Sequence, residues 1–453
     1  MRDPLRAVPR WGPVMAAHVL FADMSQAGLH TMRRAVERGH AVTFVRGLTG
    51  QTYRADQSFR DLLSCLDRVV EIPDTSDLAD LIEAIRVIHA DRPVDAVISQ
   101  CDPMLEALAT ACETLSLPYT SAAGIRNVRD KARARRLLDE AGLASARFAV
   151  VGDQASAVRA AGEIGYPVVV KPVSGLDSIL ASRADGPAAV AAAVVQIRAE
   201  AHRSTTSPQV RRLLSRGVLI EEYLAGELVS AEIGVRGGRT WRFLISGRSR
   251  GADNDCVEMG AVLPANVSPR QAKACFDYAQ AVCRAVRLDF GVFHVEMMLT
   301  RRGPVLVEVN PRVMGGVMTL LYKLLTGTDF CDYVLDLHLG LDIRPAPPAG
   351  PRTITARRIM PRDDGRLPGR VDLGWLDHSA TGIVNFENFT LEPGAQVRRQ
   401  QVLGRFAVFG ESWLSAMRQA NGLVGRFERE IGIPLIQSAP VSAGGPPAGA
   451  LTS

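Results

Sequence analysis

Two short stretches, Phe293-His294-Val295-Glu296 and Glu308-Val309-Asn310-Pro311-Arg312, decide how this chain of 453 residues is interpreted. Apolar residues around the first stretch predict a strand, Arg301-Arg302-Gly303-Pro304 predicts a turn, and the apolar residues that follow predict a second strand. A hairpin of this kind would bring Glu296 beside Glu308. Asn310 lies two residues beyond Glu308, so both side chains can face the same side of the extended chain.

These three side chains predict a metal site made only of oxygen ligands. Two carboxylates and an amide oxygen suit Mg²⁺, above all where phosphate oxygens complete its coordination shell, and Mn²⁺ is the alternative ion. Arg312 adds a planar cation that suits phosphate. The competing interpretation is a surface hairpin with scattered acids, although Glu-x-Asn-x-Arg is a costly run for a buried strand.

The run from Glu296 to Arg312 resembles the magnesium-binding signature of the ATP-grasp ligase superfamily. The resemblance extends from about residue 95 to about residue 435. It implies ATP as co-substrate, Mg²⁺ bound by Glu296, Glu308 and Asn310, and Arg312 as the catalytic residue that holds an acyl phosphate. It also implies a fold of the α/β and α+β classes, in which an open α/β domain precedes the ATP-grasp fold and a small α+β subdomain follows it.

The nucleotide site is implied by four further segments. One lysine, Lys131, follows Asp130, and a second, Lys171, ends the apolar run 168–171. Two ammonium groups can bracket the phosphates of ATP. Each lysine alone would more often be an ordinary surface residue. Loop 174–178 stands where the family has a glycine-rich flap, although Asp177 replaces a small residue, and segment 221–227 resembles the adenine hinge. The nucleotide-binding residues implied are Lys131, Lys171, Ser178, Glu222, Tyr223, Leu224 and Glu227.

Segment 256–265 resembles the Glu-x-Gly-His-x-x-Pro-[AS] stretch of the L-amino acid (dipeptide) ligase branch. The glutamate of this stretch is present as Glu258, which implies that Glu258 and Arg312 contact the substrate. Ala261 stands at the position of the histidine, which implies a different substrate. A solvent-facing acid on a strand edge is the competing interpretation of Glu258. Arg248, Arg250 and Asp253 precede this segment and either bind the substrate carboxylate or stay in solvent. His294 should face the same side as Glu296, without a catalytic role.

The resemblance implies an ATP-dependent carboxylate–amine ligase that forms an amide bond, expected to be a peptide bond, through an acyl phosphate and releases ADP and phosphate. Small-molecule amino acids, other carboxylates and amines are the implied substrates. Relatives of this kind are commonly dimers, which predicts a homodimer. Two alternatives stay open: a bicarbonate-activating carboxylase of the same superfamily, and a non-catalytic protein that binds ATP.

Composition excludes several other classes of function. The 53 Lys and Arg residues against 48 Asp and Glu leave a net charge of +5 without a long basic block, so no nucleic-acid partner is expected. Basic pairs such as Arg135-Arg136 are interpreted as solvated helix faces. No apolar run reaches about 18 residues and no signal-peptide pattern opens the chain, so we expect a cytoplasmic protein without a membrane partner. The seven cysteines lack paired spacing, which predicts reduced thiols.

Alternation of strands and helices predicts an open α/β domain near the N-terminus, without the GxGxxG run of a dinucleotide site. A Pro/Ala-rich linker at 345–351 sets a later boundary. One long amphipathic helix is predicted over 320–339. The predicted organisation is a flexible N-terminus (1–13), an N-terminal α/β domain (14–125), subdomain A (126–215), subdomain B with the metal and substrate site (216–345), a C-terminal α+β subdomain (352–437) and a disordered tail (438–453).

Overall fold

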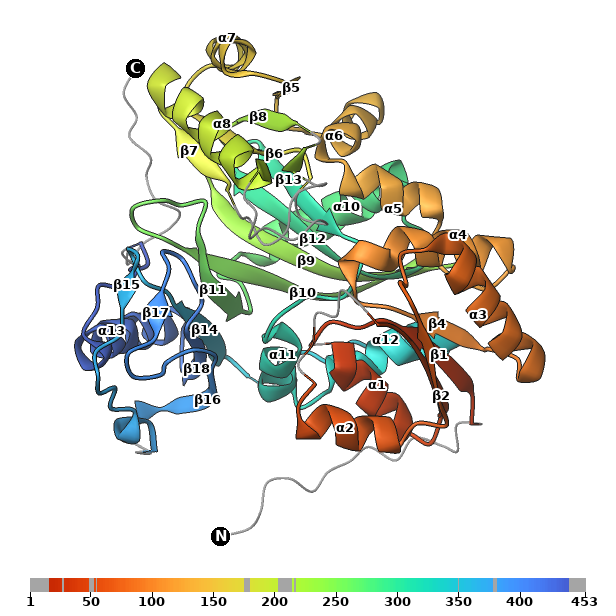
Figure 1. Ribbon diagram of the computed structural model, residues 1–453. Helices are drawn as coiled ribbons and strands as arrows, with labels where there is room; N and C mark the ends of the chain where they lie inside the picture. The colour runs from red at the N-terminus through yellow and green to blue at the C-terminus, as the bar shows by residue number, and fades with distance from the viewer. Residues whose placement is uncertain are drawn as a thin grey trace. The chain divides into compact units, whose positions relative to one another are not determined.

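The computed structural model describes residues 16–26, 28–48, 53, 55–174, 180–202, 214–215, 217–348, 350–377 and 381–439. The chain forms two compact units (Figure 1). The first unit ends at Tyr119 and also includes His338–Leu341, and the second comprises Thr120–Leu337 and the chain after Asp342. The predicted flexible N-terminus lies outside the described residues, and so does almost all of the predicted tail.

The first unit contains a four-stranded parallel sheet in the order β3-β2-β1-β4. Its helices connect the parallel strands, as the alternating pattern predicted. Leu81, Ile85 and Ile88 of α3 are buried in its core. The elements are β1 (His18–Ala22), α1 (Gly28–Glu37), β2 (Ala41–Gly47), α2 (Gln57–Ser64), β3 (Arg68–Ile72), α3 (Leu78–Asp91), β4 (Ala96–Ile98), the short helix η1 (Asp102–Met104) and α4 (Leu105–Thr114).

The second unit begins with helices and a four-stranded antiparallel sheet in the order β5-β8-β6-β7. Small residues of α7 and branched residues of α8 pack on this sheet in one apolar cluster (Figure 1). The elements are α5 (Ala122–Arg129), α6 (Lys131–Glu140), β5 (Phe148–Val151), α7 (Gln154–Ile164), β6 (Val168–Pro172), β7 (Ser182–Ala184), α8 (Pro187–His202) and β8 (Val218–Glu222).

An eight-stranded antiparallel sheet forms the rest of the second unit, in the order β13-β12-β9-β10-β11-β14-β18-β16. Because β11 pairs with β14, the sheet is continuous across the predicted linker at 345–351. The strands are β9 (Glu227–Arg236), β10 (Arg239–Arg250), β11 (Glu258–Leu263), β12 (Gly291–Thr300), β13 (Gly303–Asn310), β14 (Thr353–Ile359), β16 (Ile383–Asn388) and β18 (Gly404–Gly410), with α10 (Pro269–Ala285) between β11 and β12.

The last part of the chain adds a small apolar core around α13 (Trp413–Ile431), whose Phe427 packs on Phe406 of β18. Strands β15 (Gly365–Arg366) and β17 (Gln396–Val397) form a separate two-stranded ribbon, and η2 (Gly374–Asp377) is a short helix. The predicted α/β and α+β class is confirmed. The predicted boundaries inside the second unit stay predictions.

One element was predicted wrongly. The single helix expected over 320–339 is two helices, α11 (Met318–Thr326) and α12 (Phe330–Leu339). Gly327 adopts a left-handed conformation with φ +75° and ends α11, a role for which glycine is favoured because it has no Cβ. The sequence predicted one helix because apolar residues recur at helical spacing on both sides of this glycine.

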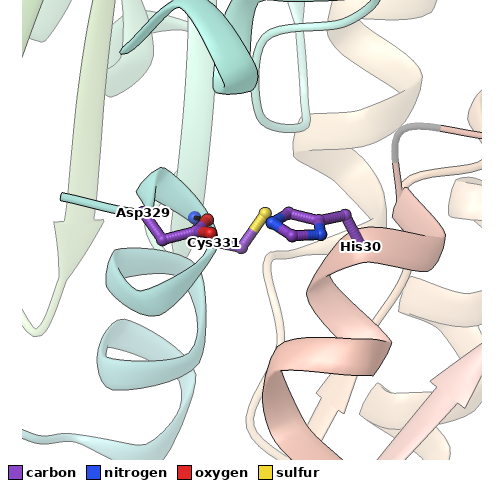
Figure 2. Close-up of side chains that lie close together, drawn as sticks. All are labelled: His30, Asp329 and Cys331. Carbon is purple, nitrogen blue, oxygen red and sulfur yellow. Dashed lines mark hydrogen bonds between the residues drawn. The ribbon is translucent and has the colours of Figure 1, made fainter. Parts of the chain in front are cut away.

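The start of α12 is held by Asp329. Its carboxylate accepts a hydrogen bond from the backbone N–H of Cys331 at 3.2 Å and pairs with Lys323 Nζ of α11 at 3.1 Å. Figure 2 shows the side chains of Asp329 and Cys331 in the second unit, and that of His30 in α1 of the first unit. These bonds fix the turn between the two helices.

Five of the seven cysteines are buried. Among the helices of the described residues, none combines the length and the apolar composition that a bilayer crossing requires.

Candidate active site

The hairpin that the sequence predicted is formed by β12 and β13. Glu296 lies directly opposite Glu308, and His294 lies opposite Asn310. The amide Nδ2 of Asn310 is 3.4 Å from Glu296 Oε1. The structure therefore brings the three predicted metal ligands together at one end of the hairpin.

A β-bulge follows this pair, because Met297 pairs with Leu306 and Val307 is left as an extra residue. The backbone groups that the bulge frees are bound by side chains from two helices. Arg135 of α6 donates to the Val307 carbonyl at 2.8 Å, and the Leu306 N–H donates to the Tyr278 hydroxyl of α10 at 2.9 Å. As a result, Leu306, Val307 and Glu308 all line one cleft, although three successive residues of a regular strand would alternate between faces.

This cleft lies within the second unit and holds about 1030 Å³ of empty space, counting its part open to solvent. Clefts with a few converging polar groups are the usual binding sites of small-molecule ligands. Asn310, Glu227 and Arg312 are not among its lining residues, and Ser178 lies outside the described part of the chain. The predicted residues that line the cleft are Lys131, Lys171, Glu222, Tyr223, Leu224, Glu258, Glu296 and Glu308.

Both predicted lysines reach the cleft from element ends. Lys131 is the first residue of α6, and Asp130 caps this helix by accepting a hydrogen bond from the N–H of Arg133. The Nζ of Lys131 lies 3.1 Å from Glu308 Oε2. Lys171, near the end of β6, lies 2.6 Å from Glu221 Oε2. An ammonium group that faces a cleft beside carboxylates can exchange one of them for phosphate oxygens.

Arg135 was predicted to be solvated, and that prediction is wrong. Its side chain is only 1% exposed and pairs with Glu221 Oε1 at 3.0 Å, so that Arg135, Glu221 and Lys171 form a buried triad. Burial lowers the pKa of Lys171 below its usual value. Burial raises the pKa of Glu221, but Arg135 and Lys171 more than offset this and hold it below its usual value. Sequence periodicity places Arg135 on a helix and gives no sign of the distant Glu221.

The predicted hinge is tied to the loop that precedes β11. The Tyr223 hydroxyl donates to the Asp255 carboxylate, which also lies 3.3 Å from Arg250 Nη1. Arg183 Cζ lies 4.6 Å from the centre of the Tyr223 ring. Glu222 pairs with Arg302 at 2.8 Å. The side chains of the hinge are thus occupied by protein partners, which leaves the backbone of the hinge as the natural contact for a base.

His294 connects Glu296 to the interior of the sheet. Its Nδ1 lies 2.5 Å from Glu232 Oε1 and its Nε2 lies 3.1 Å from Glu296 Oε1. Burial lowers the pKa of His294, but the carboxylates of Glu232 and Glu296 raise it to about 9, against the opposing charge of Arg248. Burial likewise raises the pKa of Glu296, whereas His294, Arg248 and Arg312 lower it to about 2. Glu296 is therefore ionised at neutral pH.

The donor set fits a hard divalent cation. Glu296 and Glu308 offer carboxylate oxygens from directly opposed positions, Asn310 can add an amide oxygen, and both carboxylates border the cleft where phosphate would enter. Glu296 is held ionised, as a metal ligand must be. The chemistry of these residues thus agrees with the predicted Mg²⁺.

The predicted substrate residue Glu258 begins β11 between two arginines. Its Oε2 lies 3.4 Å from Arg248 Nε and its Oε1 lies 3.3 Å from Arg358 Nη2. Ala261 is buried and pairs with Arg248 in the neighbouring strand. Asp253 lies at the surface and pairs with Arg362 at 3.1 Å. Of the polar residues predicted ahead of this segment, Arg248 is therefore the one buried against Glu258.

Comparison with known proteins agrees with this fold. Residues 164–320 match the family described as the ATP-grasp domain, and residues 32–119 match the ATP-grasp N-terminal domain. The structure is similar to the crystal structure of an L-amino acid ligase from Bacillus licheniformis, with a TM-score of 0.69 and 20% identity, over 93% of this chain and 98% of that chain. The chain is an ATP-grasp protein.

Two curated relatives are similar in sequence. An uncharacterized protein, y4rH, from Sinorhizobium fredii is 26% identical over 69% of this chain and 63% of its own length. Carnosine synthase 1 from Gallus gallus is 25% identical over 67% of this chain and 33% of its own length. The chain thus spans less than two thirds of the length of these relatives.

Proposed function

We propose that the protein is an ATP-dependent ligase that joins the carboxylate of an amino acid to an amine and forms an amide bond. The observation that carries this proposal is that Lys131, Lys171, Glu296 and Glu308 border one cleft of the second unit. Two cations for phosphate and two carboxylates for a divalent ion are the parts that phosphoryl transfer to a carboxylate needs. Similarity to an L-amino acid ligase and to carnosine synthase 1 supports an amine as the acceptor.

In the proposed reaction, Lys131 and Lys171 hold the phosphates of ATP, and the backbone of Tyr223 and Leu224 contacts the base. Mg²⁺ held by Glu296, Glu308 and Asn310 would neutralise charge on the γ-phosphoryl group. A substrate carboxylate oxygen attacks the γ-phosphorus and ADP leaves, which gives an acyl phosphate. The amine then attacks the acyl carbon, loses a proton to solvent, and phosphate leaves. Arg312 holds the acyl phosphate as its charge develops.

Phosphate release with ATP, Mg²⁺ and pairs of amino acids, combined with mass spectrometry of the products, tests this proposal. Glu308→Gln removes one charged ligand and should lower turnover by at least about 100-fold. Glu140→Gln on the exposed side of α6 is the matched control and should keep full activity. If Glu308→Gln leaves turnover unchanged with every substrate, the mechanism is wrong.

The alternatives give different results in the same assay. Phosphate release that needs bicarbonate and no amine would indicate a carboxylase. Binding of ATP without turnover of any acid and amine would indicate a non-catalytic homologue. Assembly as a homodimer remains a prediction, which light scattering on the full chain can check.

A further inference from the structure

Two arginines lie on the strands next to Glu258 in the eight-stranded sheet. Glu258 of β11 pairs with Arg358 of β14, and Arg358 lies directly opposite Arg405 of β18. Residues directly opposite in a sheet point to the same face, so the two arginine side chains leave the sheet side by side on one face. Arg405 in turn pairs with Glu387 of β16 at 2.5 Å. We call Arg358 and Arg405 the arginine pair.

The loop after the metal-binding hairpin brings Arg312 to the same place. A Cβ atom at Gly315 would lie 3.2 Å from Arg312 Nη1, and one at Gly316 would lie 3.0 Å from Arg405 Nη1. Two adjacent glycines therefore leave room for two guanidinium groups, one from the catalytic loop and one from β18. The arginine pair thus lies between Glu258, which lines the cleft, and the loop of Arg312.

Positive charge exceeds negative charge in this group. Arg248, Arg312, Arg358 and Arg405 stand against Glu258, Glu387 and Glu296, the last of which faces Arg248 and Arg312. The two members of the arginine pair face each other across neighbouring strands, which is unfavourable for like charges. Arg405 Nε is buried and has no hydrogen-bond partner among the described residues. A carboxylate or phosphate group that bridges the two guanidinium groups would remove both costs.

The carboxylate of Glu258 is not available to bind a positively charged group of a ligand. Each of its oxygens already faces an arginine, Arg248 on one side and Arg358 on the other. A substrate ammonium at this position would have to compete with both guanidinium groups. The surroundings of Glu258, whose two arginine partners lie behind the residues that line the cleft, therefore favour a negative group over a positive one.

We propose that the arginine pair binds a second anionic group of the substrate, so that the enzyme acts on an amino acid with an acidic side group. That group is a carboxylate or a phosphate in addition to the groups that enter the amide bond. This inference rests on the proposed function, because it places the group next to the loop that holds the acyl phosphate. Bidentate arginine contacts suit both anions.

Calorimetric titration of the full-length protein tests the proposal directly. With Mg²⁺ and a non-hydrolysable ATP analogue present, glutamate is compared with glutamine, aspartate with asparagine, and phosphoserine with serine. At least one anionic member should bind about tenfold or more tightly than its neutral partner. The pair that shows the preference identifies whether carboxylate or phosphate is the group.

Variants assign the preference to these residues. Arg405→Gln and Arg358→Gln should each bring the ratio of the two dissociation constants close to one, and Arg405→Lys should keep part of it. Arg418→Gln, on the exposed side of α13, is the matched control and should keep all of it. Thermal melting and ATP affinity of each variant show whether it is folded.

A wild-type ratio near one for all three pairs, or a preference that survives in both glutamine variants, overturns the proposal. Turnover measured in parallel separates it from the proposed function. Turnover of neutral amino acids without any anion preference rejects the anion site and keeps the ligase. An anion preference that depends on the arginine pair, without turnover of any substrate, keeps the site and rejects the ligase.

Discussion

Lys171 is held in an environment that differs from that of a surface lysine. It is buried beside Glu221, while Arg135 pairs with the other oxygen of that carboxylate. Two cations thus share one anion, and burial is the main cause that lowers the pKa of Lys171. An incoming phosphate would supply the negative charge that this triad lacks.

The lowered pKa predicts how ATP binding depends on pH. Only the charged form of Lys171 attracts phosphate, and that form is lost as pH rises through a pKa below the usual value of 10.5. ATP affinity should therefore fall at a lower pH than for an ordinary lysine. The arginine of Lys171→Arg stays charged up to about pH 12, so the ATP affinity of this variant should change less with pH. Titration of an ATP analogue between about pH 7.5 and about pH 10 measures both curves. Identical curves would contradict this prediction.

At the scale of elements, the hairpin could be predicted because its signals are local. The predicted turn at 301–304 and the two apolar runs suffice to set Glu296 against Glu308. The bulge at Val307 could not be predicted, since its freed groups bind Arg135 and Tyr278, which come from helices elsewhere in the chain. The same reason explains the error at Arg135. Local patterns report the element but not its distant partner.

The junction between β18 and α13 depends on a glycine. A Cβ atom at Gly410 would lie 2.3 Å from the backbone nitrogen of Ala416, whereas one at Gly422 in α13 would meet nothing within 4 Å. We expect Gly410→Ala to lower the free energy of unfolding by about 1–3 kcal/mol, because the strand and helix must move apart. Gly422→Ala is the control and should raise it by about 0.5–1 kcal/mol. Urea unfolding measures both, and equal effects would contradict the steric argument.

At the scale of the whole molecule, the composition of segment 345–351 predicts a boundary, whereas strand pairing joins the chain before it to the chain after it. A Pro/Ala-rich stretch predicts a linker between subdomains, and that signal is local. Strand pairing is not local, and β11 before the stretch joins β14 after it in one sheet. Residues that bind the proposed metal and residues of the arginine pair consequently belong to the same sheet.

Truncation tests this continuity. A chain that ends at residue 345 loses β14 and exposes one edge of β11, so it should aggregate, because unpaired edges invite pairing with other chains. A chain that ends at residue 439 keeps the whole sheet and serves as the control. Sedimentation of the purified proteins compares them. A monomeric product that ends at 345 and melts at the same temperature as the control would contradict the prediction.

The pairing of β11 with β14 also sets an order of events on the ribosome. β11 is complete at Leu263, but its partner begins at Thr353, about 90 residues later, which takes roughly 5–20 s at about 5–20 residues per second. During that interval the hairpin of β12 and β13 is made while the edge next to Glu258 has no partner. Nascent chains stalled between these two points should therefore require chaperones, and slow codons placed there would lower the yield of native protein.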